Sequence, residues 1–384
     1  MTSILKRWFP FTRPAEPILP GVYASQPKPD APVPYRLHLR VEADGSGLLL
    51  VNASTVLHLN STATAHALEL IRDATVPDAA RAVRSRFRVS RGRALADQQQ
   101  LRDQIMRLAT QPDLDPVVYL GMERRTPFVA SLSAPYRIDL ALTYAMDPAG
   151  KIDPLARKRV RRELTEKEWK AVLSSAWAAG VPHVTFTGGE PCRRKDLVAL
   201  IGYAQELGQI TGLLTEGRRL ADAKYLASIE AAGLDHILLS YAPGEKASQA
   251  GLHAALASDI FTAVHLTLSG SQKKLTATLT ELKRLGVPAV SMTSANPGNP
   301  GRKLLDGCRQ AAADLGLDLI WDLPAPYSAR HPIQLDLDQP ALGGGRAWLY
   351  VEPDGDVLPG QGVDRVLGNV LHDSWSDLWA RASS

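Results

Sequence analysis

The nine residues His183-Val-Thr-Phe-Thr-Gly-Gly-Glu-Pro191 decide the fold of this chain. An apolar, β-prone run leads directly into two glycines, a glutamate and a proline, and a helical stretch follows. This pattern predicts a buried strand whose carboxyl end opens into a tight loop before a helix. Because glycine has no side chain, the backbone of such a loop can approach a ligand closely.

The same kind of unit repeats through the second half of the chain. Helical stretches end in glycine, the residue that caps helices in the left-handed conformation, and a short β-prone run follows each one. These glycines are Gly180, Gly208, Gly233, Gly286 and Gly316. A repeated helix, cap and strand is typical of a parallel α/β sheet or barrel. We therefore expect successive parallel strands at residues 138–143, 183–187, 210–215, 236–240, 264–268 and 289–293.

One helix of this series carries a complete start signal. Thr165 and Glu168 have the spacing of a capping box, in which each side chain bonds the backbone of the other. Trp169, Val172 and Leu173 then begin an apolar face with helical periodicity. The sequence therefore predicts a helix that starts just after Thr165 and packs on the sheet.

Hydroxyl side chains end most of the expected strands. Five of these six stretches finish on threonine or serine, at Thr143, Thr187, Thr215, Ser240 and Thr293. Active sites of βα barrels lie at the carboxyl ends of the strands, so a ring of hydroxyls there predicts a polar ligand mouth. The alternative is that threonine simply favours strands.

Composition excludes several classes of protein. The 384 residues carry 44 basic and 40 acidic side chains, a near-neutral balance without a nucleic-acid signal. Two cysteines argue against a disulfide framework and fit a cytoplasmic setting. No apolar stretch approaches the roughly 20 residues of a membrane span, and no secretory signal is recognisable. Residues 10–35 are rich in proline and predict an extended leader.

In their order and spacing, the motifs of residues 136–295 resemble those of radical S-adenosylmethionine (SAM) enzymes, especially the PqqE-like branch that modifies ribosomal peptides. The matching stretches are Leu142-Thr143, Glu163-Leu-Thr165, Gly188-Gly-Glu-Pro191, Arg194-Lys-Asp-Leu197 and Thr215-Glu-Gly217. The resemblance implies a partial (βα)6 TIM-like barrel at residues 135–323. It also implies that SAM is bound by Thr187, Gly188, Gly189, Glu190, Pro191, Thr215 and Ser240.

The chain departs from this family where iron would bind. The cysteines of the family's cluster motif are replaced by Met146, Gly150 and Asp153. A cubane cluster needs thiolates placed together in one loop, so we expect neither a [4Fe–4S] cluster nor reductive cleavage of SAM. Glu190 could still accept from an ammonium group, which leaves binding of SAM, or of a similar amino acid or nucleoside, open.

Residues 324–384 resemble a shortened SPASM or twitch extension. An Asp354-Gly355 turn predicts a β-hairpin, and Trp375 and Trp379 predict a small amphipathic helix after it. The positions that hold auxiliary-cluster cysteines in the family are here Leu342 and Gly360. The resemblance therefore implies a degenerate extension that follows the barrel.

The N-terminal part has a different pattern. After the leader at 1–32, residues 33–110 predict a hairpin around Asp44-Gly45, a third strand at 56–59, and helices at 61–72, 76–87 and 97–109. This winged-helix-like α+β order is similar to PqqD-like domains, the leader-peptide recognition elements of peptide maturation, and a linker at 111–134 follows. Such domains bind a peptide as an added strand at a sheet edge.

The alternative for this region is a winged-helix-like domain that binds nucleic acid. It rests on a basic run formed by Arg81, Arg84, Arg86, Arg88, Arg91 and Arg93. A solvated helix face is the commoner source of such a run, so a nucleic-acid partner is not expected.

Two further groups of residues are candidates for chemistry. His183, His236 and His265 lie on three expected strands and could form a metal site with Asp139, although buried, hydrogen-bonded histidines are the commoner arrangement. Cys192 follows the glycine loop, where a thiol could be a nucleophile or a small buried residue. The sequence predicts no metal site.

Three functions remain open. The preferred hypothesis is a pseudoenzyme or repurposed scaffold that binds a precursor peptide, together with SAM, beside another maturation enzyme such as a cysteine-intact radical SAM protein. The second is a non-radical SAM- or metal-dependent enzyme acting on a peptide, for which Asp147, Asp153, Glu190 and Glu216 are acidic candidates. The third is an active radical SAM enzyme, which the missing cysteines oppose.

Overall fold

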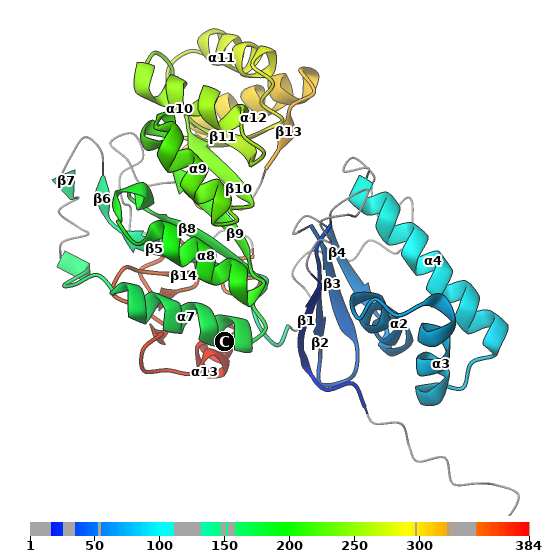
Figure 1. Ribbon diagram of the computed structural model, residues 1–384. Coiled ribbons are helices and arrows are strands. Elements are labelled where there is room, and N and C mark those ends of the chain that lie inside the picture. The colour runs from blue at the N-terminus through cyan, green and yellow to red at the C-terminus, as the bar shows by residue number, and fades with distance from the viewer. Residues whose placement is uncertain are drawn as a thin grey trace, which may run out of the picture. The chain divides into compact units, whose positions relative to one another are not determined.

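The computed structural model describes residues 17–25, 35–52, 55–110, 132–146, 151–152, 158–295, 298–320, 324 and 343–383. The chain divides into two compact units, Met1–Thr126 and Pro127–Ser384, which are drawn in Figure 1 and described separately below. The finer boundaries at residues 110, 134 and 323 stay predictions. Most of the expected linker lies outside the described residues.

The first unit is a four-stranded antiparallel sheet with helices on one face (Figure 1). Its strands, in spatial as well as chain order, are β1 (Gly21–Ser25), β2 (Leu37–Val41), β3 (Gly47–Val51) and β4 (Thr55–Leu59). Alternate apolar residues such as Leu37, Leu39 and Leu49 turn toward the helices and pack on Leu68 and Ile105. The helices are α2 (Ser61–Ile71), α3 (Val76–Arg86) and α4 (Arg91–Thr110).

Two expectations for this unit need correction. The proline-rich stretch is not leader throughout, because Gly21–Ser25 pairs with β2 as an edge strand. The last helix begins at Arg91, six residues earlier than its apolar pattern indicates. Its first residues are polar, and the Ser90 hydroxyl accepts from the backbone N–H of Arg93, so a cap rather than burial sets the start.

The second unit is an α/β barrel-like sheet, as expected. The six predicted strands are present as β5 (Arg137–Thr143), β8 (His183–Gly188), β9 (Ile210–Thr215), β10 (His236–Ser240), β11 (Phe261–Leu268) and β12 (Ala289–Ser294). Neighbours in the order β5-β8-β9-β10-β11-β12 pair in parallel, and β13 (Asp318–Leu319) continues the sheet beyond β12.

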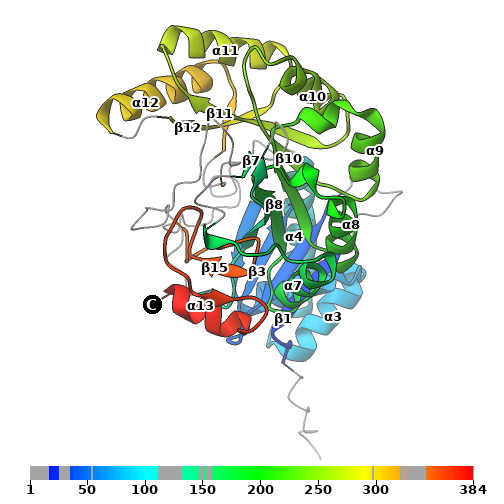
Figure 2. The same ribbon diagram turned by 90° about the vertical axis from the view of Figure 1, so that its left-hand side faces the viewer.

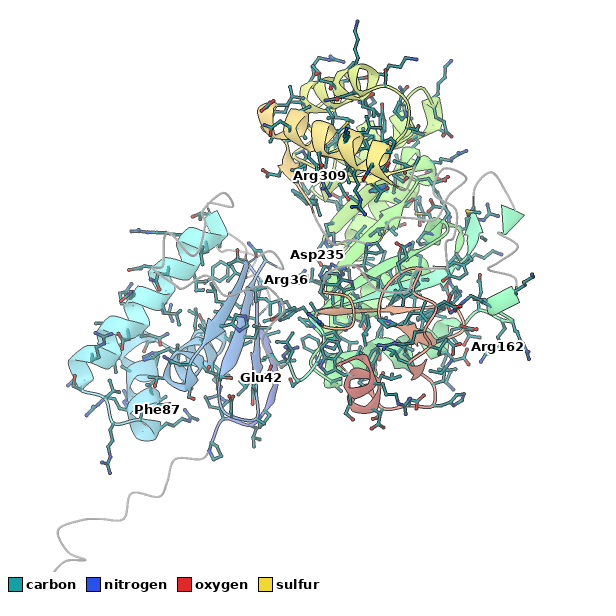
Figure 3. The ribbon with its side chains drawn as sticks, turned by 180° about the vertical axis from the view of Figure 1, so that it is seen from behind. Arg36, Glu42, Phe87, Arg162, Asp235 and Arg309 are labelled. Carbon is teal, nitrogen blue, oxygen red and sulfur yellow. The ribbon has the colours of Figure 1, made fainter. Side chains whose placement is uncertain are left out.

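Helices cover the outer face of this curved sheet (Figure 2). They are α7 (Glu166–Ala178), α8 (Leu197–Leu207), α9 (Ala223–Ala231), α10 (Lys246–Leu256), α11 (Gln272–Arg284) and α12 (Asn299–Asp314). The predicted capping box of α7 is confirmed, with both Thr165–Glu168 bonds formed. Arg162, labelled in Figure 3, adds a salt bridge of 2.7 Å to the Glu168 carboxylate.

Strand alternation gives the sheet two chemically different faces. Outward side chains such as Val184 and Phe186 are apolar and pack against the helices. Inward side chains on the same strands are polar or small, among them Asp139, Thr185, Thr187, Ser240, His265 and Ser291. An apolar outer shell holds the barrel together, while the inner face keeps groups that can bind a ligand.

The C-terminal extension completes the sheet at its β5 edge. Strand β14 (Trp348–Val351) pairs in parallel with β5 and turns at Gly355 into β15 (Asp356–Leu358), which pairs with β16 (Gly368–Asn369). The hairpin is the predicted one, with Gly355 in the left-handed region (φ 93°). The pairing of β14 with β5 was not predicted, because the sequence pattern of a hairpin does not indicate which other strand it will pair with.

The last helix, α13 (Trp375–Ser383), is anchored by the two predicted tryptophans. The indole N–H of Trp375 donates to the Ser175 hydroxyl at 3.0 Å, and that of Trp379 donates to the Leu132 carbonyl at 2.7 Å. No helix among the described residues is long and apolar enough to cross a membrane.

Two mid-helix glycines provide a test of the packing around the barrel. A Cβ on Gly251 of α10 would lie 1.9 Å from the Gly217 carbonyl oxygen, whereas one on Gly202 of α8 would meet nothing within 4 Å. We expect Gly251→Ala to cost about 1–3 kcal/mol of unfolding free energy through overpacking. Gly202→Ala should stabilise by up to about 1 kcal/mol, since alanine is the better helix former. Urea unfolding of both variants measures this; equal effects would contradict the packing.

Candidate functional site

The loop after β8 is built on a close approach of two backbones. A Cβ on Gly188, whose φ is 115°, would lie 2.2 Å from the Thr143 carbonyl oxygen, and one on Gly189 would lie 2.4 Å from that of Ala145. The N–H groups of Gly189 and Glu190 donate to these same two carbonyls, each at 2.8 Å. The two glycines are therefore required by contact with the chain that leaves β5, a requirement that the ligand-based expectation had not included.

The Glu190 carboxylate braces this loop against β9. It is 3% exposed and accepts hydrogen bonds from the Thr215 hydroxyl at 2.8 and 2.9 Å, the Glu216 N–H at 2.8 Å and the Cys192 N–H at 3.0 Å. Burial raises the pKa of Glu190, and the bonds from Glu216 and Thr215 offset part of that rise. Both oxygens already have partners in the chain, so Glu190 acts first as a brace.

Pro191 opens a short 3-10 helix, η1 (Pro191–Arg193), which buries Cys192. The Cys192 thiol is 1% exposed and lies 3.4 Å from the Thr215 hydroxyl. Burial raises the pKa of this thiol well above its usual value, followed by the effect of the Glu190 charge. The geometry favours the small buried residue over the nucleophile.

The Thr187 hydroxyl is a polar group without a partner. It is fully buried on the inner face of β8, directly before the glycine loop, and no hydrogen bond reaches it among the described residues. An orphaned hydroxyl in the interior costs about 1–3 kcal/mol, so Thr187 is a candidate for a bond to a partner outside the described residues, such as a ligand. Ser240 ends β10 one residue beyond the level of Thr215 and is partly exposed.

The other expected hydroxyls are used within the protein. Thr143 donates to the Glu163 carboxylate and accepts from the Ala145 N–H at 3.0 Å. Thr293 shares a hydrogen bond of 3.1 Å with His265. The structure thus gathers Thr187, Thr215 and the Gly188–Pro191 loop at one rim, while Thr143 and Thr293 maintain the barrel.

A hollow of about 640 Å³ lies beside this rim. Thr143, Ala145, Glu163, Arg193, Arg194, Lys195 and Asp196 line it. Arg194 is one of these lining residues and donates to Asp196 at 2.6 Å and to the carbonyls of Leu142 and Leu164 at 3.1 and 3.0 Å. This clamp was not predicted, although the stretch Arg194-Lys-Asp-Leu197 already stood out by sequence.

The positions expected to carry cluster cysteines are only partly described. Met146 lies in β6 (Ala145–Met146), which pairs with β7 (Lys151–Ile152), and packs in an apolar cluster with Tyr144, Tyr350 and Leu358. Gly360 follows β15 and is buried. Gly150, Asp153 and Leu342, like the acidic candidate Asp147, lie outside the described residues.

The histidines do not converge on a metal site. The rings of His183 and His236 meet edge to face, with centroids 5.0 Å apart, and Asp139 instead pairs with Arg137 at 2.8 Å. His265 bonds to Ser291 and Thr293 farther along β11. Among the described residues, the only cluster with the spacing of metal ligands is Glu352, Asp354 and Asp356.

Comparison with known proteins agrees with this geometry. No protein-family model matches the chain. It is 29% identical over 286 residues to the PqqA peptide cyclase of Rhizobium meliloti, covering 65% of this chain and 72% of that protein. It is 27% identical to the PqqA peptide cyclase of Xanthomonas euvesicatoria over 288 residues, 66% of this chain and 74% of that one.

The fold is also that of Streptococcus suis SuiB. The structure of SuiB bound to S-adenosylmethionine superposes with a TM-score of 0.57 at 13% identity, covering 93% of this chain and 88% of SuiB. That of SuiB bound to precursor peptide SuiA gives 0.57 at 14%, covering 89% and 86%. The sequence similarity to the PqqA peptide cyclases and the fold shared with SuiB support the PqqE-like branch of radical SAM proteins as the class to which this chain is similar.

His236 provides a test of the barrel interior through pH. Burial, followed by the charge of Arg137, lowers the pKa of His236 from 6.5 to about 4. Because the unfolded chain takes up this proton below about pH 6.5 and the folded chain does so only near pH 4, stability should fall as the pH drops through this window, by on the order of 2 kcal/mol.

His236→Gln should remove this part of the pH dependence in denaturant unfolding measured between these two pH values. His253→Gln, at an exposed position on α10, is the matched control and should leave the profile unchanged. Identical profiles for wild type and His236→Gln would contradict a neutral histidine at this half-buried position.

Proposed function

We propose that this chain is a radical-SAM-like protein of ribosomal peptide maturation that binds a precursor peptide and SAM without a [4Fe–4S] cluster and without radical chemistry. One observation carries the proposal. The chain has the glycine loop of the motif that it shares with radical SAM enzymes, braced by Glu190, yet its two cysteines, Cys192 and Cys308, are both buried and lie on different elements. It acts as a pseudoenzyme or repurposed scaffold.

The residues present do not suit an iron–sulfur cluster. A cubane needs three thiolates in one loop, and the loop that leaves β5 supplies none by sequence. Met146, at one of the expected positions, belongs to an apolar cluster, and a thioether there is a poor substitute for a thiolate. We therefore derive no radical step for this chain.

The same rim suits SAM better. The Thr187 and Ser240 hydroxyls are side chains that can bond a ligand, and Gly188 and Gly189 follow Thr187 directly at the end of β8. Glu190, Pro191 and Thr215 contribute by holding that backbone in place, since the carboxylate is already bonded to Thr215. Without iron to chelate the amino acid end, binding should be weaker than in a cluster-containing relative.

The first unit is proposed to bind the peptide as a PqqD-like recognition domain. Strand β4 lies at an edge of its sheet, and Val56 on that strand is 39% exposed. An edge strand with open backbone groups accepts an extended peptide as a further strand. The relatives are named for the PqqA peptide, and SuiB has been seen with the precursor peptide SuiA.

The arginine run of this unit does not favour nucleic acid. Arg81 pairs with Asp78 at 2.9 Å, Arg93 with Asp97 at 2.8 Å, and Arg86 with Glu69 at 3.7 Å. Cations already matched by neighbouring carboxylates make a weak phosphate site. We propose that a second maturation enzyme, with its cluster cysteines intact, performs the chemistry on the bound peptide.

SAM binding tests the proposal at Thr187. Calorimetric titration of the iron-free protein should give a saturable SAM isotherm. Thr187→Val keeps the shape of the side chain and removes the orphaned hydroxyl, so we expect affinity to fall about tenfold while unfolding free energy is unchanged or rises.

Thr262→Val is the matched control. Thr262 lies at the start of β11, away from the carboxyl-end rim, and its hydroxyl donates to the Ile260 carbonyl. It should leave SAM affinity unaltered. Absence of SAM heat in wild type would remove the cofactor from the proposal. Stoichiometric iron and sulfide after anaerobic reconstitution, with a charge-transfer band at ~400 nm, would overturn the iron-free part of the proposal.

Peptide binding tests the first unit. Fluorescein-labelled PqqA peptide and SuiA serve as probes in anisotropy titrations. Lysine on an edge strand blocks strand addition, so Val56→Lys on β4 should weaken binding by about tenfold or more. Val22→Lys, at the opposite edge on β1, should not. Equal losses from both variants, or binding insensitive to either, would contradict β4 as the docking edge.

A further inference from the structure

A buried carboxylate of the C-terminal hairpin holds the chain that leaves β5. The Tyr144 hydroxyl donates to Glu352 at 3.0 Å. The guanidinium of Arg159 donates to both Glu352 oxygens, from Nε at 3.1 and 3.0 Å and from Nη2 at 2.6 Å. Glu352 is 1% exposed, and its two partners lie on either side of the segment where the family places its cluster motif.

Glu352 belongs to a cluster of three carboxylates, with Asp354 and Asp356, whose oxygens lie within 4.8 Å of one another. Arg159 supplies a positive charge beside this cluster. Burial raises the pKa of Glu352, and the hydrogen bonds and charge of Arg159 counter that rise. A bidentate arginine is among the strongest partners for a carboxylate, and its loss would leave a buried charge unpaired. Arg159 also pairs with the exposed carboxylate of Asp364.

Tyr144 links Glu352 to the glycine loop. It stands between Thr143 and Ala145, whose carbonyls accept from the N–H groups of Gly189 and Glu190. Its ring packs with Tyr350 and Leu358 of the same C-terminal extension. Any displacement of Tyr144 therefore moves the two carbonyls on which the loop rests.

We propose that Glu352 is the positioning residue of the ligand rim: through Tyr144 and Arg159 it fastens the chain after β5, so that the glycine loop keeps its shape without iron. A cluster bound by three thiolates would itself tie that chain together. Here an ion pair and a hydrogen bond from the C-terminal extension do so. The inference deepens the proposed function and rests on it for the identity of the ligand, SAM.

Amide exchange in the full-length protein tests the fastening without any ligand. The N–H groups of Gly189 and Glu190 are the reporters, and that of Leu317, bonded to Ala312 at the end of α12, is the reference. Glu352→Gln keeps the size of the side chain and removes the ion pair. We expect exchange at Gly189 and Glu190 to accelerate about tenfold or more, with little change at Leu317.

Asp364→Asn is the matched control, because it removes the exposed partner of Arg159, 66% exposed, and leaves Glu352 in place. It should change exchange by less than about twofold. If Glu352→Gln fails to fold, Tyr144→Phe removes one hydrogen bond only and should act in the same direction. Unchanged exchange at both reporters in a folded Glu352→Gln or Tyr144→Phe variant would overturn the proposal, as would an equal acceleration at Leu317.

SAM titration of the same variants separates the two proposals. Glu352→Gln should weaken SAM binding about tenfold, and Asp364→Asn should leave it within about twofold. A wild type that binds no SAM would defeat the proposed function, while amide exchange would still decide the role of Glu352. A Glu352→Gln variant with accelerated exchange and full SAM affinity would defeat the positioning role.

Discussion

The close contact between two backbones at the carboxyl ends of β5 and β8 is the constraint on which the site depends. Gly188 and Gly189 lie so near the carbonyls of Thr143 and Ala145 that no side chain fits between them. That contact allows the two loop N–H groups to bond across the strands, and it turns Glu190 toward Thr215. The loop, its brace and the chain leaving β5 are consequently one unit.

The sheet around this unit separates stability from binding. The outer face is apolar and packs on the helices, whereas the inner face carries buried hydroxyls, an Arg137–Asp139 ion pair and histidines. Polar groups survive in such an interior only when they are bonded or await a ligand. His265 is bonded to Ser291, for example, whereas the Thr187 hydroxyl at the rim has no hydrogen-bond partner among the described residues. Even without iron chemistry, the proposed scaffold therefore keeps a polar group at the rim that can bond a ligand.

Local patterns predicted most of the barrel. Strands β8, β9, β10 and β12 were recognisable because a glycine-capped helix preceded each of them, and α7 because Thr165 and Glu168 form their bonds within one turn. The prediction failed where the signal was weak or distant. Strand β1 was mistaken for leader because Gly21–Ser25 is short and stands in a proline-rich context. The start of α4 at Arg91 was missed because its first turn has no apolar stripe.

The sequence by itself determined the α/β class, the six parallel strands of the barrel and the absence of cluster cysteines, since these depend on neighbours a few residues apart or on composition alone. Only the tertiary structure decided which polar groups are hydrogen-bonded within the protein. Glu190 is bonded to Thr215, whereas Thr187 has no partner among the described residues. Glu352 is bonded to Tyr144, 208 positions away in the chain. Burial and hydrogen bonding depend on what folds against a residue, and no local pattern records that partner.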